Sequence, residues 1–145
     1  MLGSFHYRCC SAMCISAAET LQRRMDALIQ NLSDPGVYYP GRLDDCLDRL
    51  RPLFNAEEIL MIQTRYPDYP LQQMAHRCFM REMLGLRGNG LFSENEKCAC
   101  EWLTRHEKLG DTLFRIYLRN LMPEKKADIC RIPAADNVML TMKIL

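Results

Sequence analysis

The stretch SAAETLQRRMDALIQNL, residues 16 to 32, decides the fold class. Ser16 and Glu19 lie three residues apart, the spacing of a capping box, in which two side chains satisfy free amides at a helix start. Apolar residues then recur at the spacing of one helix face, at Leu21, Met25, Leu28 and Leu32. The stretch therefore predicts an amphipathic helix from Ser16 to Leu32.

Similar signals along the chain predict five more helices. They are expected over residues 42–51, 55–63, 70–86, 93–109 and 111–122. Pro52 is expected to end the second helix, because proline lacks the amide hydrogen and clashes with the preceding turn. Gly110 is expected to end the fifth helix in a left-handed conformation. Six short helices with short connections predict an all-α fold, a compact bundle over residues 16–123.

The two ends of the chain are predicted to lie outside the bundle. Residues 1–15 are expected to form a poorly ordered leader, with a targeting or secretion-system address as the alternative, because this segment has no acidic residue. Residues 124–145 form a C-terminal tail that is expected to pack on the bundle. Its sequence VMLTMKIL suits a strand, a seventh helix or an exposed apolar end. No stretch reaches the roughly 20 apolar residues of a membrane span.

Composition limits the classes of partner and the compartment. The 145 residues suit one domain, and 19 basic against 18 acidic residues give a net charge of +1. Such a balance creates no general attraction for DNA, RNA or an anionic membrane, so nucleic acid is not an expected partner. Several of the eight cysteines fall on apolar faces of predicted helices, which favours free thiols and a reducing compartment, the cytoplasm, over a disulfide scaffold.

The sequence CACEW, residues 98 to 102, invites comparison with a metal clasp. Residues two apart point to nearly opposite sides of a helix. Cys98 is therefore expected in the core with Trp102 and His106, whereas Cys100 is expected to face solvent. Cys98 and His106 are also about 12 Å apart along the helix axis, which is too far for one ion.

The same spacing argument applies to His76 and Cys78, and the chain has no CxxC or HxxxH pair. No metal ligand and no cofactor is therefore expected. Catalytic motifs are also absent: the sequence has no GxSxG, P-loop, dinucleotide-binding or HExxH pattern. No catalytic residue is predicted.

Residues 100–120, CEWLTRHEKLGDTLFRIYLRN, have the order helix, glycine, helix of a DNA-binding motif. A recognition helix needs one polar face that can read the groove. Here the second helix is apolar around most of its circumference, and only Arg115, Arg119 and Asn120 form a polar strip. A DNA-associated transcriptional regulator is therefore kept as the alternative function, and a small cysteine-dependent enzyme as the third.

The predicted helix over residues 70–86 carries the candidate binding surface. Its core stripe is expected to contain Leu71, Met74, Ala75, Cys78, Phe79 and Leu86. Met80 and Leu84 form a second apolar pair on the other side, with Arg77 at its rim. Exposed apolar patches mark contact sites, and interface cores favour Met and Arg. We therefore expect a small soluble protein that binds another protein, as an adaptor, inhibitor, chaperone or effector. Self-association and simple two-sided packing are the alternatives for this surface.

Overall fold

The computed structural model describes residues 11–121, and every regular element in this range is helical. The elements are α1 (Ser11–Ser33), the short 3-10 helix η1 (Pro35–Val37), α2 (Arg42–Gln63), α3 (Tyr69–Gly85), α4 (Phe92–His106), the π-helical segment η2 (Glu107–Asp111) and α5 (Thr112–Asn120). The predicted all-α class is confirmed. The predictions for residues 1–10 and for the tail beyond residue 121, including VMLTMKIL, lie outside the described range.

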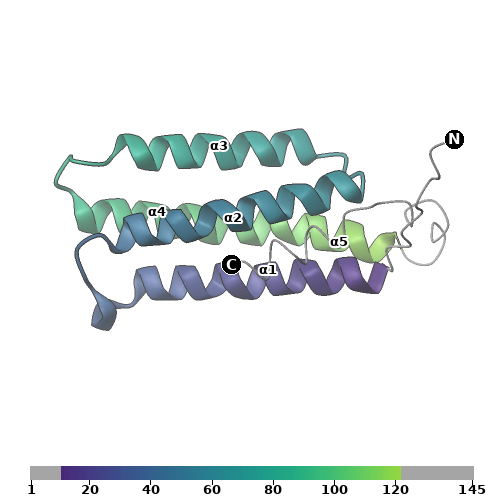
Figure 1. Ribbon diagram of the computed structural model, residues 1–145, viewed down its shortest axis with the longest axis horizontal. Helices are drawn as coiled ribbons and strands as arrows, with labels where there is room; N and C mark the ends of the chain where they lie inside the picture. The colour runs from purple at the N-terminus through teal and green to yellow at the C-terminus, as the bar shows by residue number, and fades with distance from the viewer. Residues whose placement is uncertain (1–10, 122–145) are drawn as a thin grey trace, which may run out of the picture.

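The predicted count of six helices is wrong, because two pairs of predicted helices are continuous. Pro52 lies inside α2, where buried Leu50 and Leu53 on either side of it hold both halves against the same core. Likewise, α4, η2 and α5 follow one another without an intervening loop. Residues 11–121 therefore form four helical rods (Figure 1).

Gly110 does not terminate a helix, and it is not among the glycines with positive φ. It lies in η2, where an added Cβ would come within 2.6 Å of Gln72 Nε2 from α3. The residue therefore permits a close approach of the α3 side chain. Gly110, which predicted a helix end in the sequence, is therefore explained by its packing against Gln72.

The rods lie side by side, with α1 and α3 on opposite sides of α2 and the α4–α5 rod (Figure 1). Helix α1 packs against α2, α4 and α5, whereas α3 packs against α2. Buried apolar side chains from all four rods form one core. No helix in the described part of the chain has the length and apolar character needed to cross a membrane.

Two predicted helix starts differ from the structure. Helix α1 begins at Ser11, so Ser16 lies inside it and not at its cap, and α4 begins at Phe92 without a side-chain cap from Ser93. Glu96 follows Ser93 at the three-residue spacing of a capping box, but its side chain is buried against Arg42 at the start of α2. Arg42 Nε donates to Glu96 Oε2 over 2.6 Å, and Arg42 Nη1 donates to the Asp34 carbonyl over 2.5 Å. This tertiary ion pair has replaced the local capping box.

The predicted core stripe of α3 is right at Phe79 but wrong at Leu71, Met74 and Cys78, which are exposed. The buried residues of this helix are His76, Phe79 and Met83, whereas Leu71 and Met74 are exposed. The prediction counted histidine as polar and so rotated the buried face. In the structure the His76 side chain is only 2% exposed, because neighbouring helices supply partners for its ring nitrogens.

Candidate functional site

Two histidines and three carboxylates meet inside the bundle. Glu57 and Glu58 come from α2, His76 from α3, His106 from the last residue of α4 and Asp111 from the end of η2. Four of these side chains are almost fully enclosed: 2% of His76, 7% of His106, 8% of Glu57 and 9% of Asp111 is exposed. Buried charged groups are costly unless they are paired, so this cluster needs a specific explanation.

The π-helical segment η2 brings His106 and Asp111 together. Residues five apart diverge around a regular α-helix, whereas the i→i+5 hydrogen bonds of a π-helix make the turn wider. His106 and Asp111 are five residues apart, and His106 Nε2 lies 3.3 Å from Asp111 Oδ1. Single π turns are frequent at functional sites in helical proteins.

The remaining distances show how closely the polar atoms converge. His76 Nε2 and His106 Nε2 are 2.9 Å apart, and Glu57 Oε2 is 3.6 Å from His76 Nε2. On the other side of its ring, His76 Nδ1 is 2.8 Å from Glu58 Oε1. Glu57, His76 and His106 each offer one ligand atom, and these atoms lie within 4.8 Å of one another.

The hydrogen bond to Glu58 fixes the tautomer of His76. A carboxylate accepts hydrogen bonds only, so His76 Nδ1 carries a proton and donates it to Glu58. Burial lowers the pKa of His76, although Glu58 opposes this shift, and the ring is neutral. The lone pair of His76 Nε2 therefore points to His106 Nε2, which donates its proton to it.

Glu57 and Asp111 share a hydrogen bond but have opposite pKa shifts. Burial, followed by the adjacent negative charge of Asp111, raises the pKa of Glu57 well above 4.5. Burial also opposes ionisation of Asp111, but its contacts with His106 and Glu57 more than offset this effect and lower the pKa of Asp111. Protonated Glu57 therefore donates to ionised Asp111.

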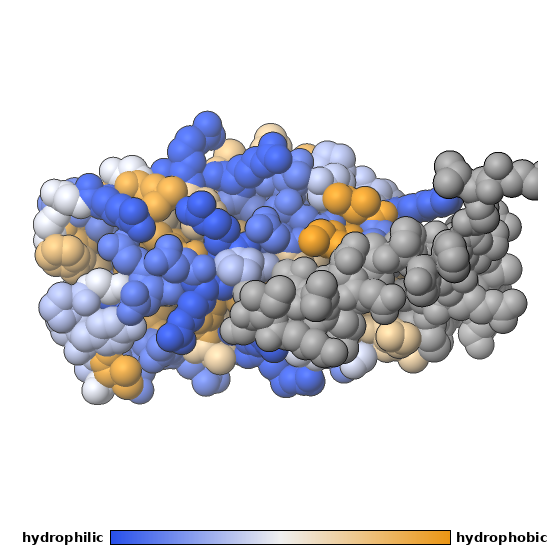
Figure 2. Space-filling model, viewed as in Figure 1, coloured by the Kyte–Doolittle hydropathy of each residue, from blue (hydrophilic) through white to orange (hydrophobic). Residues whose placement is uncertain are grey.

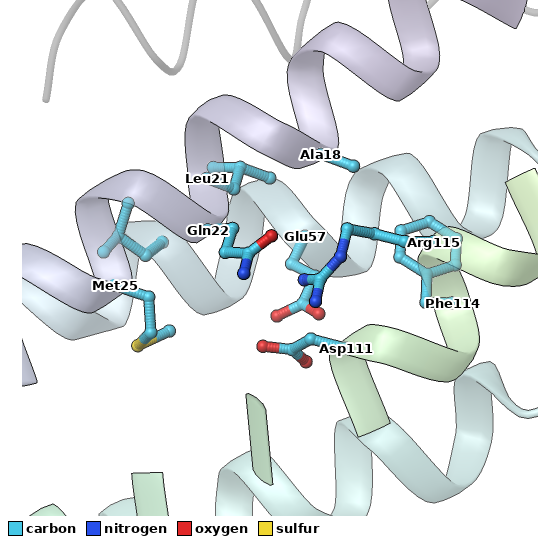
Figure 3. A pocket seen from close by; sticks show the side chains of 9 residues that line it. Ala18, Leu21, Gln22, Met25, Glu57, Asp111, Phe114 and Arg115 are labelled. Atoms are coloured by element: carbon cyan, nitrogen blue, oxygen red, sulfur yellow. The ribbon is translucent and has the colours of Figure 1, made fainter. Parts of the chain in front are cut away.

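A small cavity borders the carboxylate side of the cluster. It has a volume of about 20 Å³ and lies between α1, α2 and α5. Figure 3 shows the carboxylates of Glu57 and Asp111 facing this cavity, with the side chains of Gln22 and Arg115 directed toward them. A polar cavity needs only about 10–15 Å³ to hold one water molecule, so this cavity can hold one.

Aromatic rings enclose the histidine side. Phe54 stacks on His76 with ring centroids 3.9 Å apart, and Trp102 stacks on His106 at 4.6 Å. His106 lies beside Trp102 as expected, although its side chain is more deeply buried than the sequence predicted. Trp102 itself, which was expected in the core, is only partly buried and packs against the core.

The sequence predictions for CACEW placed the two thiols on the wrong sides of the helix. Cys98 is exposed and Cys100 is half-buried, with its thiol 3.9 Å from the Ile29 carbonyl. Ala99 and Leu103, which the helical wheel placed with Cys98, are buried as expected, but the buried face extends toward Cys100 and not toward Cys98. The two cysteines still do not point the same way, so the objection to a CACEW clasp stands.

The partner-binding residues predicted from the sequence line a groove between α2 and α3. Arg77, Met80 and Leu84 come together there with Phe54, and the groove encloses about 440 Å³. Arg77 is exposed, whereas Met80 and Leu84 are half-buried and pack against the core. Met80 and Leu84 are therefore less exposed than the sequence predicted.

Other exposed apolar side chains are spread over the surface. Figure 2 shows apolar patches interrupted by hydrophilic side chains on the viewed face. Exposed apolar residues include Leu71 and Met74 on α3, and Leu109, Leu113 and Ile116 along η2 and α5. The α2–α3 groove combines an apolar floor with a charged rim, so it is the better candidate for binding.

The structure removes the basis for a helix-turn-helix motif at residues 100–120. This segment is continuous through η2, so no turn separates two helices. Comparisons with profiles of known protein families, with characterised proteins and with solved structures give no match. The functional argument therefore depends on the groove and on the buried cluster.

Proposed function

We propose that this chain is a protein-binding module whose α2–α3 groove takes an acidic amphipathic helix of another protein. The observation that carries the proposal is the combination of an apolar floor and a basic rim in one groove. Phe54, Met80 and Leu84 provide apolar surface. An amphipathic helix binds such a groove through its apolar face.

The positive charge at the rim of the groove favours an acidic partner. Arg51, Arg77 and Arg81 are exposed at its edge, and none of them forms an ion pair with a carboxylate of residues 11–121. The acidic residue in the groove, Glu58, is already bonded to His76 and Gln73. The three guanidinium groups attract acidic residues that flank the apolar face of a bound helix.

A charge-reversal variant tests this function. In Arg77→Glu with Arg81→Glu, two exposed groups change sign, so we expect an unchanged melting temperature and loss of the partner. Arg23→Glu on α1 is the matched control, because Arg23 is exposed and is hydrogen-bonded to Thr20 of its own helix. A photo-crosslinking amino acid at Asn55, which lines the groove, should attach to an acidic helical segment.

The outcomes separate the alternatives. Capture of the same partner by the wild type and by the charge-reversal variant would reject the groove as the binding site. Crosslinks from Asn55 to a second copy of the chain, with a monomer–dimer shift in sedimentation, would replace the proposal with self-association. The identity of the captured protein then decides whether the module acts as an adaptor, inhibitor, chaperone or effector in the cytoplasm.

A further inference from the structure

We propose that Glu57, His76, His106 and Asp111 form a buried binding site for one divalent transition-metal ion of the zinc class. The four side chains come from three of the four rods. The ligand atoms of Glu57, His76 and His106 lie within 4.8 Å of one another, and Asp111 Oδ1 lies 3.3 Å from His106 Nε2. This site is distinct from the α2–α3 groove, and its test does not depend on a protein partner.

The spacing of the donor atoms fits a tetrahedral ion. Zinc bonds to nitrogen and oxygen of about 2.0–2.1 Å place neighbouring ligand atoms about 3.3 Å apart in a tetrahedron. The observed separations are 2.9 Å between the two Nε2 atoms, 3.3 Å from His106 to Asp111 and 3.6 Å from His76 to Glu57. These three separations lie on either side of the tetrahedral value, so only small movements of these side chains are needed to bring each of these pairs to it.

An unsatisfied buried oxygen points to the same ligand. Asp111 Oδ1 is fully buried and has no hydrogen bond of good geometry with the described residues, although His106 Nε2 is near it. Native proteins contain few such atoms, and a bound ion can satisfy them. A divalent cation would satisfy Asp111 Oδ1 and would replace the hydrogen bond from His106 at the lone pair of His76 Nε2.

Glu58, which lies outside the four proposed ligands, orients His76 as carboxylates do in known metal sites. A metal-binding histidine usually donates its second ring nitrogen to a carboxylate, which fixes the ring and increases its basicity. Glu58 accepts such a bond from His76 Nδ1 at 2.8 Å, and its other oxygen is 3.4 Å from Gln73 Nε2. Imidazole and carboxylate ligands with no thiolate suit Zn²⁺, Co²⁺ or Fe²⁺ better than soft Cu⁺.

Binding of a cation requires that the protons held by the metal-free cluster move or leave. The metal-free cluster holds one proton between the two histidines and one between Glu57 and Asp111. A divalent ion would displace them: His106 would change tautomer, so that its proton moves to Nδ1 and Nε2 bonds the ion, and the Glu57 carboxyl would release its proton to solvent and bond the ion as a carboxylate. Release of protons is the usual accompaniment of metal binding by such ligands.

The test uses the full chain, treated with chelator and then titrated with Co²⁺ in the presence of a phosphine reductant. We expect one equivalent to bind and to give the visible absorption of tetrahedral Co²⁺, without the near-ultraviolet band of a thiolate ligand. Zn²⁺ should displace Co²⁺ and raise the melting temperature.

Variants locate the ion. Glu57→Gln keeps the shape of the protonated carboxyl, so it should fold and lose binding, and His106→Gln should also lose binding. Glu58→Gln should weaken binding by about 10–100-fold through its effect on His76. Glu101→Gln, an exposed carboxylate on α4, is the matched control and should bind as the wild type does.

The proposal is overturned by any of three results: no saturable Co²⁺ spectrum, a thiolate band that disappears in Cys78→Ser with Cys98→Ser, or full binding by folded Glu57→Gln. None of these results bears on the groove. Loss of the protein partner in the arginine variant with metal binding retained would show that the two sites are independent.

Discussion

At the residue scale, burial decides which thiols can react. Burial raises the pKa of Cys46 to about 12 and also raises the pKa of Cys100. Because the thiolate is the reactive form, both thiols are poor nucleophiles at neutral pH. This weakens a cysteine-dependent enzyme as a function for these two positions.

We predict that Cys98 reacts with iodoacetamide faster than Cys100, and that Cys46 reacts slowest, because Cys98 is the exposed thiol of the three. Peptide-resolved mass spectrometry of the folded protein at neutral pH measures the order. In denaturant the three rates should converge, which serves as the control. Faster reaction of Cys100 than of Cys98 would mean that α4 packs against the core with a different face from the one described here.

At the element scale, the sequence identified helices but not their limits. Amphipathic stripes such as Leu21 to Leu32 are sufficient for the all-α class, because helix formation and burial of that face need the same spacing. Helix ends depend on local signals that tertiary contacts override. Glu96 illustrates this, since its side chain pairs with Arg42 and not with the start of its own helix.

The cluster could not have been predicted from spacing within one helix. Its side chains come from residues 57, 76, 106 and 111, and the packing of α2, α3 and the α4–α5 rod brings them together. Asp111 was interpreted as a cap and Gly110 as a terminator, because the π turn has no clear sequence signal. The groove was easier to find, since Met80 and Leu84 lie four residues apart on one helix.

Pro52 gives a prediction for α2. Proline in a helix interior removes a hydrogen bond and clashes with the carbonyl four residues earlier, so Pro52→Ala should increase the free energy of unfolding by about 1–3 kcal/mol. Denaturant titration at an unchanged slope measures the gain. Pro70→Ala is the control and should change stability by less than about 0.5 kcal/mol, because proline suits the first turn of α3. Equal effects at both positions would contradict this account.

At the scale of the whole molecule, the apolar core is sufficient to hold the bundle together. It joins buried side chains of all four rods, including Leu50, Met61, Leu103 and Phe114, and a proton on Glu57 removes one buried negative charge when no ion is bound. A chain of this size does not need a metal or a disulfide in order to fold.

We therefore predict that the far-ultraviolet circular dichroism of the protein keeps its helical form after treatment with EDTA and dialysis. The melting temperature in chelator should be lower than in Zn²⁺, but unfolding should remain one cooperative transition. Loss of helix at room temperature in EDTA would mean that the bundle depends on an ion for its folding.

The stacking of Trp102 has a consequence for observing the molecule in solution. Trp102 is the single tryptophan of the chain, and its ring lies nearly parallel to His106, at an interplanar angle of 11°. A positive charge on that imidazole would lie against the π face of the indole. The tryptophan fluorescence of the protein therefore comes from Trp102 alone. A change in the charge of His106 would change this emission without any added label.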